Sequence, residues 1–332
     1  MTIQSVNTRF RAYQLDSAGS SFSYFSGDKF VLIEGRYCEA NESNIKKELE
    51  ICGLDRISTL HITSWDQDHC SPSQLKKILD DFRPTRVEHP GYKPHTDSGR
   101  ESQEILKHYR ARSFKPRIVA ITPEYIESLD TASSYGYQDI MYWPKKIDAE
   151  NANNNSTVKQ FRSGSFNVLS LGDVESTHIS SYLRRTRSIY SEVDILIMAH
   201  HGADNGFTSS AFLKLVKPTL AIATSNYGNQ FDHPKPEIRE LLHKNEVRLF
   251  TTKTGDVIVK SIGNHTGQFK VINLKADSTE ISSCYVGQAR NEMGTPTVLQ
   301  HDQQARTTCA TRNTVTMRHL MPWKNAHRIG QG

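Results

Sequence analysis

Residues 57–70 read ISTLHITSWDQDHC, an apolar stretch that runs directly into a short polar loop. The apolar half predicts a buried strand. The loop brings Asp66, Asp68 and His69 into four consecutive positions, and carboxylate oxygens and imidazole nitrogens are groups with which proteins bind divalent cations. The segment therefore predicts a site for one or two metal ions, although by itself it fits a solvated acidic loop with a capping aspartate equally well.

Three further polar clusters each follow a predicted strand: Gly172-Asp173, His200-His201-Gly202 and His233-Pro234. Each cluster alone has an ordinary interpretation, as a turn, a pair of structural histidines or a loop. Adjacent histidines on an extended backbone point to different sides, so we expect at most one of His200 and His201 to bind a given metal. Layered α/β folds place their sites at strand ends, and one metal site explains all four clusters together.

The remaining segments alternate between strand and helix patterns. Strands are expected at residues 9–16, 29–33, 57–63, 117–121, 165–171, 193–198, 219–224, 247–250 and 257–260, and helices at residues 44–52, 73–82, 209–216 and 236–243. Gly27-Asp28 is typical of a hairpin turn, and the asparagine-rich residues 148–157 are expected to form a loop or insertion. This pattern predicts a layered α/β domain over residues 5–262 and a C-terminal extension over residues 263–332.

Composition excludes several classes of protein. A hydrophobic fraction of 36% in 332 residues is ordinary for a globular protein and excludes a collagen-like, coiled-coil or disulfide-scaffold chain. The five cysteines are widely spaced and contain no CxxC pair, which favours the reducing cytoplasm as the location. No apolar run reaches the length of about 18 residues that a membrane span requires, so we expect neither a signal peptide nor a membrane partner.

The net charge of +5 is unevenly distributed. Residues 83–117 contain nine basic and four acidic residues with aromatic residues between them, a pattern that can bind a phosphate backbone and stack on bases. The nucleic-acid-binding candidates are Arg86, Lys93, Arg110, Arg112, Arg184 and Arg185. The alternative is a solvated face on an inserted helix. From about residue 286 the composition is polar and basic, which predicts a tail that is disordered or folds on a protein partner.

The ordered series of polar clusters resembles the metallo-β-lactamase superfamily, and in particular the hydrolase domain of the ComEC-type competence proteins and related phosphodiesterases. The loop of that group runs HxDxDH and is followed by GD, HHG and HP elements. The counterparts here are Asp66, Asp68 and His69, then Asp173, His200-His201-Gly202 and His233-Pro234. The resemblance covers roughly residues 10–262 and implies a four-layered αββα sandwich with a poorly ordered C-terminal extension.

The resemblance also implies a ligand set and roles for its members. The metal ligands would be Asp66, Asp68, His69, Asp173, His201 and His233, and the catalytic residues Asp68, His200 and His201. Asp173 would bridge two metals, and the histidine of the pair that is not a ligand would bind a phosphate oxygen or protonate the leaving group. Ser64 stands where the group has the first histidine of its loop, and Glu34 stands where it usually has aspartate.

These expectations define the function predicted from the sequence. The chain is expected to hydrolyse phosphodiester bonds with a water activated by one or two divalent ions, zinc or manganese. Nucleic acid, DNA or RNA, is the expected substrate. The alternatives are a phosphodiesterase for cyclic nucleotides or other small molecules, and a binding module of the same fold that has lost activity through Ser64.

Overall fold

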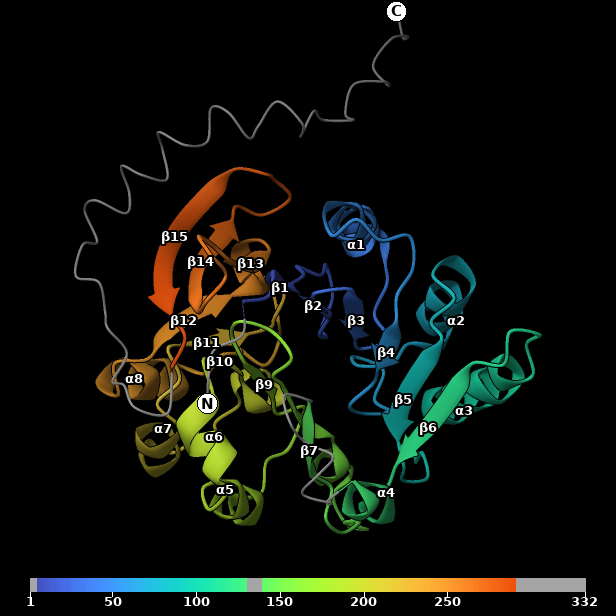
Figure 1. Ribbon diagram of the computed structural model, residues 1–332. Coiled ribbons are helices and arrows are strands. Elements are labelled where there is room, and N and C mark those ends of the chain that lie inside the picture. Colours follow the sequence, from blue (N-terminus) through green and yellow to red (C-terminus); the bar gives the residue numbers. More distant parts are fainter. Residues whose placement is uncertain (1–4, 130–138, 291–332) are drawn as a thin grey trace, which may run out of the picture.

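Two β-sheets pack face to face in the computed structural model, which describes residues 5–129 and 139–290 (Figure 1). The first sheet has the order β15-β14-β13-β1-β2-β3-β4-β5-β6 and the second the order β12-β11-β10-β9-β8-β7. The strands of the first sheet are β1 (Thr8–Ala12), β2 (Phe22–Ser26), β3 (Lys29–Ile33), β4 (Thr59–His61), β5 (Arg86–Pro90), β6 (Arg117–Ile121), β13 (Val257–Ser261), β14 (Gln268–Leu274) and β15 (Ile281–Gln288). Those of the second are β7 (Ile140–Trp143), β8 (Val158–Phe161), β9 (Val168–Ser170), β10 (Ile195–Ile197), β11 (Leu220–Ala223) and β12 (Arg248–Thr251).

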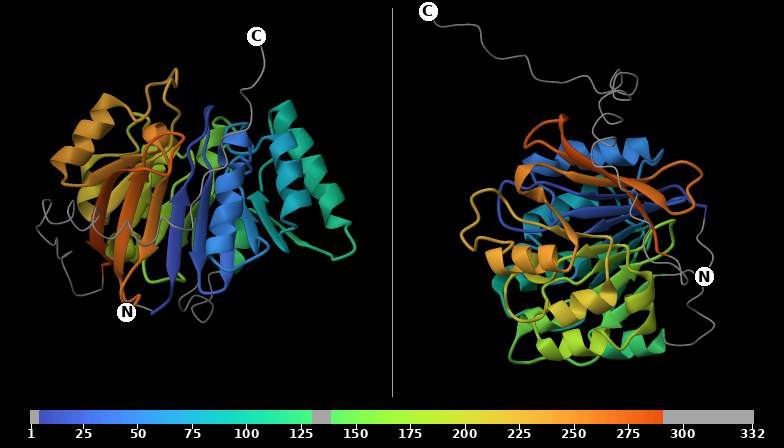
Figure 2. Two further views of the ribbon diagram at one scale, coloured as in Figure 1. Left: turned by 90° about the horizontal axis from the view of Figure 1, so that it is seen from above. Right: turned by 90° about the vertical axis from the view of Figure 1, so that its left-hand side faces the viewer.

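Helices cover the outer face of each sheet, as the two views of Figure 2 also show. The helices are α1 (Glu39–Ile51), α2 (Pro72–Asp81), α3 (Asp97–Arg110), α4 (Pro123–Ser128), α5 (Thr177–Leu183), α6 (Arg187–Glu192), α7 (Ser210–Val216) and α8 (Pro236–Lys244). One apolar cluster joins α1, α2 and α3 to the first sheet, another joins α5 to α8 to the second sheet, and a third fills the space between the sheets. The predicted four-layered αββα sandwich is thus confirmed.

The strands that carry the predicted site are short, apolar and parallel. In β10 and β11 every residue is buried, because the core between the sheets covers one face and helices cover the other. Parallel pairs β3-β4, β4-β5, β9-β10 and β10-β11 bring the carboxyl ends of strands from both sheets to one edge of the sandwich. The polar clusters all follow strands that end at this edge.

The hairpin and the asparagine-rich segment have more structure than the sequence pattern predicts. The Gly27-Asp28 turn joins β2 and β3, but β2 was not recognised as a separate strand. The asparagine-rich segment contains a short 3₁₀ helix, Ala152–Asn155. The side-chain oxygen of Asn154 accepts hydrogen bonds from the backbone N–H groups of Glu175 and Ser176, at 3.2 and 3.0 Å. The insertion therefore fixes the turn that leads from β9 into α5.

The first sheet continues beyond residue 262, where the sequence pattern placed the end of the domain. Strand β14 pairs with β13, and β15 pairs with β14. Phe269 and Val271 are fully buried between the sheets while their neighbours along β14 are partly exposed. This alternation is typical of a strand in which one face packs on the core and the other faces solvent. The first sheet therefore extends beyond the predicted boundary at residue 262, as far as Gln288 at the end of β15. The tail predicted from about residue 286 overlaps the end of this strand, and residues 291–332 lie outside the described residues.

No helix in residues 5–129 and 139–290 combines the length and the apolar character needed to cross a bilayer.

Candidate metal centre

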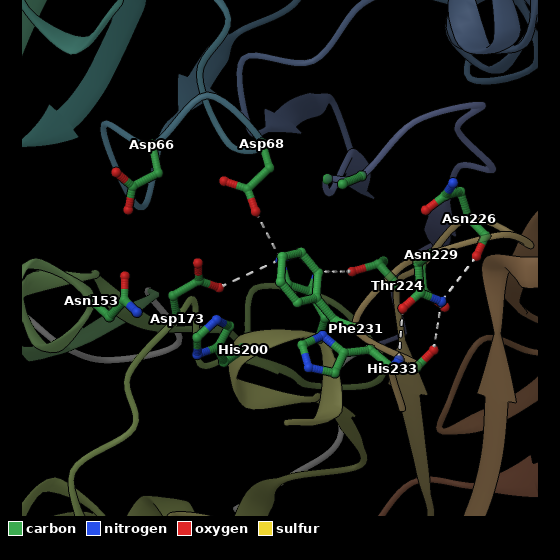
Figure 3. A pocket seen from close by; sticks show the side chains of 14 residues that line it. Asp66, Asp68, Asn153, Asp173, His200, Thr224, Asn226, Asn229, Phe231 and His233 are labelled. Atoms are coloured by element: carbon green, nitrogen blue, oxygen red, sulfur yellow. Dashed lines mark hydrogen bonds and ion pairs between the residues drawn. The ribbon is translucent and has the colours of Figure 1, made fainter. Parts of the chain in front are cut away.

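The four predicted clusters meet at one cavity of about 210 Å³. The loop after β4 contributes Asp66 and Asp68, and the turn after β9 contributes Asp173. The segments after β10 and β11 contribute His200, His201 and His233. Figure 3 shows Asp66, Asp68, Asp173, His200 and His233 around the cavity. The order of the strands, and not their spacing in the sequence, brings the clusters together.

Four of these side chains form a compact ligand set, namely Asp68, His69, Asp173 and His201. One ligand atom from each lies within 4.8 Å of the others. The Nε2 atom of His69 is 2.8 Å from a carboxylate oxygen of Asp173 and 4.0 Å from one of Asp68. The Nε2 atom of His201 is 3.2 Å from Asp68 and 3.8 Å from Asp173. Two carboxylates and two imidazoles therefore point at one small volume.

The chemistry of these residues fits a divalent cation. Asp173 is 3% exposed and His69 is 1% exposed, and ionisable groups are rarely buried this deeply unless they are paired or bind a metal. The Nε2 atom of His69 is buried and has no hydrogen-bond partner, despite its short ion-pair distance to Asp173. A buried imidazole nitrogen that faces two carboxylates can bind a cation once its proton is released.

The electrostatics of the cluster also favour positive charge. Burial by itself would lower the pKa of His69, but the carboxylates of Asp173 and Glu34 raise it well above its ordinary value. Burial opposes ionisation of Asp68, yet the nearby imidazoles of His69 and His201 hold the pKa of this carboxyl below its usual range. The pKa of Asp173 is lowered as well, because the charge of His69 outweighs the effect of burial. Both carboxylates are thus ionised at neutral pH.

A layer of buried polar groups orients the ligands. Glu34 accepts hydrogen bonds from the backbone N–H and the hydroxyl of Thr63, at 3.0 and 2.6 Å, and one of its oxygens lies 3.2 Å from Nδ1 of His69. On the other side, Nδ1 of His201 is 3.0 Å from the hydroxyl of Thr224. The Nδ1 atom of each imidazole is thereby held by a neighbouring oxygen, and its Nε2 atom faces the cluster.

We expect Glu34→Gln to weaken metal binding about 10- to 100-fold, the usual cost of disturbing a group that orients a ligand. Glutamine keeps the size of the side chain but removes the charge that faces His69. A competition titration with a chromogenic chelator measures this change in dissociation constant. Glu88→Gln is the matched control, because Glu88 is also buried but pairs with His61, away from the cluster. Equal affinities in wild type and Glu34→Gln would contradict the role of Glu34.

The two adjacent histidines do not lie on an extended backbone as expected. Both have left-handed conformations, with φ of +46° at His200 and +57° at His201, and Gly202 follows at +88°. Residues other than glycine adopt this region at an energetic cost. Both imidazoles consequently line the cavity, but only His201 joins the ligand set. His200 instead has its Nδ1 atom 3.1 Å from a carboxylate oxygen of Glu175.

The two remaining predicted ligands, Asp66 and His233, line the cavity but lie outside the compact set. A carboxylate oxygen of Asp66 accepts a hydrogen bond from the hydroxyl of Ser64 at 3.1 Å, and the other is 3.6 Å from Nε2 of His95. The imidazole of His233 is stacked on that of His201, with ring centroids 6.2 Å apart. Burial, together with the nearby histidines, lowers the pKa of His233 to about 4, so this imidazole is neutral at pH 7.

Ser64 is fully buried and does not face the ligand set. Its hydroxyl lies 3.2 Å from the hydroxyl of Tyr92, which also accepts a hydrogen bond from the backbone N–H of Trp65. His61 does not replace the missing imidazole, because its Nδ1 atom pairs with Glu88 at 2.9 Å. Residues three apart on a strand face opposite sides, which agrees with this arrangement.

The structure separates most of the predicted nucleic-acid-binding residues from the cavity. Arg86 begins β5 opposite the first residue of β4, at the end of the strands away from the site, and it pairs with Glu88. Arg110 ends α3 and bonds the carbonyl of Ile118, while Arg112 pairs with Asp80 on the surface. Because α3 runs antiparallel to β5 and β6, its basic C-terminal turn lies at this same distant end.

The other basic candidates lie on different elements. Lys93 lines a second hollow together with His95 and the asparagine-rich segment, and that hollow shares Asn153 with the metal-site cavity. Arg184 and Arg185 follow α5, whose first turn comes after the Asp173 loop. The basic residues therefore do not form one strip that leads into the cavity. Sequence spacing could not show this, because basic residues that lie close together along the chain belong to different helices and strands.

Thr224 and Phe231 are among the cavity residues that were not predicted as site residues from the sequence. Thr224 is an ordinary polar residue at a strand end, so only its contact with His201 identifies it. Phe231 precedes the Asp232-His233-Pro234 turn, and an isolated aromatic residue in a loop gives no signal until its exposure is known.

Comparison with known proteins agrees with the resemblance inferred from the motifs. No family model matches the chain. The sequence is 24% identical to ComE operon protein 3 of Bacillus subtilis (strain 168) over 220 residues, which are 66% of this chain and 26% of that protein. It is 28% identical to competence protein ComA of Neisseria gonorrhoeae over 112 residues, 33% of this chain and 16% of the relative. The chain thus matches about a quarter or less of the length of these relatives.

Among solved structures, the metallo hydrolase Igni18 of Ignicoccus hospitalis KIN4/I superimposes with a TM-score of 0.44 at 12% identity, covering 75% of this chain and 98% of that one. The two sequence relatives confirm the likeness to ComEC-type competence proteins that the order of the four clusters predicts.

Proposed function

We propose that this chain is a metal-dependent hydrolase of phosphodiester bonds and that its substrate is DNA or RNA. The observation that carries the proposal is the convergence of Asp68, His69, Asp173 and His201 within 4.8 Å at the edge of an open cavity. The competence proteins that the sequence resembles support the same assignment. A divalent ion held by these residues would supply the positive charge to which a phosphodiester oxygen binds.

The four residues of the ligand set would hold a divalent ion, zinc or manganese. Such an ion supplies Lewis acidity toward a phosphoryl oxygen and acidifies a water molecule. Asp68 and Asp173 provide the negative charge that binds the ion, and His69 and His201 complete the set. His200 lies outside this set but lines the cavity, with its Nδ1 atom held by Glu175. Its Nε2 atom is the one that would hold a proton for the leaving oxygen.

The structure favours a single tightly bound ion. The four ligands of the compact set surround one position. A second position beside Asp66 lacks an imidazole from the loop after β4, because residue 64 is a serine. The hydroxyl of Ser64 contacts Asp66 and Tyr92. Fewer ligands give a weaker site, so Asp66 would contribute to a second ion only at high metal concentration.

A second candidate is hydrolysis of a small phosphodiester such as a cyclic nucleotide. The cavity of about 210 Å³ is below the usual range of pockets for drug-sized ligands, and Arg86, Arg110 and Arg112 lie at the far end of the strands. Both observations favour a small substrate whose contacts all lie within the cavity. A long phosphate backbone would need cationic side chains beside the cavity.

We expect the protein loaded with manganese or zinc to bind a single ion per chain and to cleave single-stranded DNA, RNA or cyclic nucleotides, with activity lost in EDTA. Metal content is measured by plasma mass spectrometry, and cleavage by gel electrophoresis and chromatography of the products. Cleavage of the polymers alone supports the nuclease, and cleavage of the cyclic nucleotides alone supports the second candidate. Metal binding without turnover of any substrate would contradict both and indicate a binding module.

A further inference from the structure

One wall of the cavity is formed by the segment between β11 and α8, which carries two exposed aromatic side chains. Phe231 is 53% exposed and lines the cavity, whereas Tyr227 is 82% exposed and does not. In the view of Figure 3, the ring of Phe231 lies over the centre of the cavity. An exposed phenylalanine beside buried catalytic polar groups is a more specific feature than a scattered surface apolar residue.

Phe231 is the outer member of a column of rings that begins at the metal ligands. Its ring is stacked on the imidazole of His233, with centroids 5.7 Å apart and planes inclined by 25°. The imidazole of His233 is in turn stacked on that of His201, at 6.2 Å and 14°. Among the described residues, His233 is the only ring that packs against Phe231. The outer face of Phe231 is therefore free to receive another flat ring.

The segment holds Phe231 in place without burying it. The side chain of Asn229 accepts a hydrogen bond from the backbone N–H of His233 at 2.7 Å. Its amide nitrogen donates to the carbonyls of His233 and Asn226, both at 3.1 Å. Asn229 thus ties both ends of the turn that presents Phe231. A ring that is fixed before binding loses little conformational entropy when a ligand stacks on it.

Two polar atoms on the same wall have unused hydrogen-bonding capacity. The hydroxyl of Ser225 and the side-chain oxygen of Asn226 are buried and have no partner in the structure, and both residues line the cavity. Unsatisfied buried polar atoms are uncommon in proteins, so this wall holds hydrogen-bonding capacity that the described residues do not use.

We propose that this wall is a nucleobase-binding subsite, in which Phe231 stacks on the base next to the scissile phosphate. The inference rests on the proposed phosphodiester hydrolysis and deepens it, because it assigns a nucleotide as the unit that enters the cavity. Stacking on an aromatic side chain tolerates every base. The subsite thus serves a nucleic acid and a cyclic nucleotide alike.

The test compares two esters with the same leaving group, thymidine 5′-(4-nitrophenyl) phosphate and methyl 4-nitrophenyl phosphate. Release of nitrophenolate gives kcat/KM for each ester, and their ratio isolates the contribution of the base. We expect Phe231→Ala to lower this ratio about tenfold, mainly through KM, since stacking on one aromatic ring has this magnitude. Phe231→Trp retains a ring and should preserve the ratio. Tyr227→Ala is the matched control in the same segment and should leave both reactions unchanged.

Binding of thymidine 5′-monophosphate, measured by calorimetry, makes the test independent of turnover. Phe231→Ala should raise its dissociation constant about tenfold, whereas Tyr227→Ala should not. If the wild type hydrolyses neither ester, the proposed function fails, and the binding data still decide whether the subsite exists. An ester ratio and a nucleotide affinity that are both unchanged in Phe231→Ala would overturn the subsite, even if both reactions became slower.

Discussion

Replacement of Asp68 and His69 together by alanine should abolish bound metal and hydrolysis alike, with kcat/KM lower by roughly three orders of magnitude or more. The two residues supply half of the compact ligand set, and both point at the same small volume from one loop. The remaining pair, Asp173 and His201, offers too few ligands to hold an ion tightly. Plasma mass spectrometry of the purified variant and the cleavage assay measure the two effects.

The matched control for this double variant is Asp55→Ala with His108→Ala. Asp55 and His108 are both exposed and lie outside the cavity, so the control removes the same two side-chain types without touching the ligand set. It should retain wild-type metal content and activity. Retained hydrolysis in the Asp68 and His69 double variant would sink the assignment of this cluster as the reactive centre.

Replacement of Asp256 by alanine should lower the free energy of unfolding by about 3–5 kcal/mol, the cost of breaking a buried ion pair on one side. One oxygen of Asp256 accepts hydrogen bonds from Nε and Nη2 of Arg11 at 2.8 and 2.5 Å, and the other accepts one from the backbone N–H of Gln14 at 2.6 Å. Arg11 is 5% exposed, and in the variant it keeps a longer contact to Glu48, at 3.3 Å, and its position over the ring of Tyr13. The buried guanidinium of Arg11 would then lose most of the negative charge that offsets the cost of its burial.

Urea unfolding followed by circular dichroism measures this loss. Asp80→Ala is the control, because Asp80 pairs with Lys76 and Arg112 on the surface, where ion pairs contribute less than about 1 kcal/mol. The Asp256 pair joins β1 to β13, and through Glu48 it joins both to α1. A loss in Asp256→Ala no larger than that in Asp80→Ala would show that this network does not stabilise the first sheet.

The parts of the fold that follow from local pattern could be predicted well. The strand at 117–121 has the bounds expected from the sequence, and the helix at Pro236–Lys244 begins at its proline as expected. Strand β14 was missed because only alternate residues such as Phe269 and Val271 are buried, and its polar half made the segment resemble a tail. A strand with one solvent-exposed face has fewer apolar residues, and is therefore harder to recognise in the sequence, than the fully buried strands β10 and β11.

The sequence alone determined which kinds of side chain follow the strands and in what order. It could do so because hydrophobic periodicity marks strand ends locally, and carboxylates and imidazoles are recognisable by type. From this order followed the expectation of a metal centre and the resemblance to the metallo-β-lactamase superfamily, which in turn implied the four-layered sandwich.

Only the tertiary structure decided which candidates meet. It placed His201 in the ligand set, directed His200 to Glu175, kept Asp66 beside Ser64, and sent Arg86 and Arg110 to the opposite end of the strands. It also placed Phe231 on the cavity wall, although the sequence signal of that segment was limited to His233 and Pro234. The physical reason is reach: a ligand must come within a few ångströms of its partners, and that distance depends on sheet order, strand direction and the backbone angles of single residues.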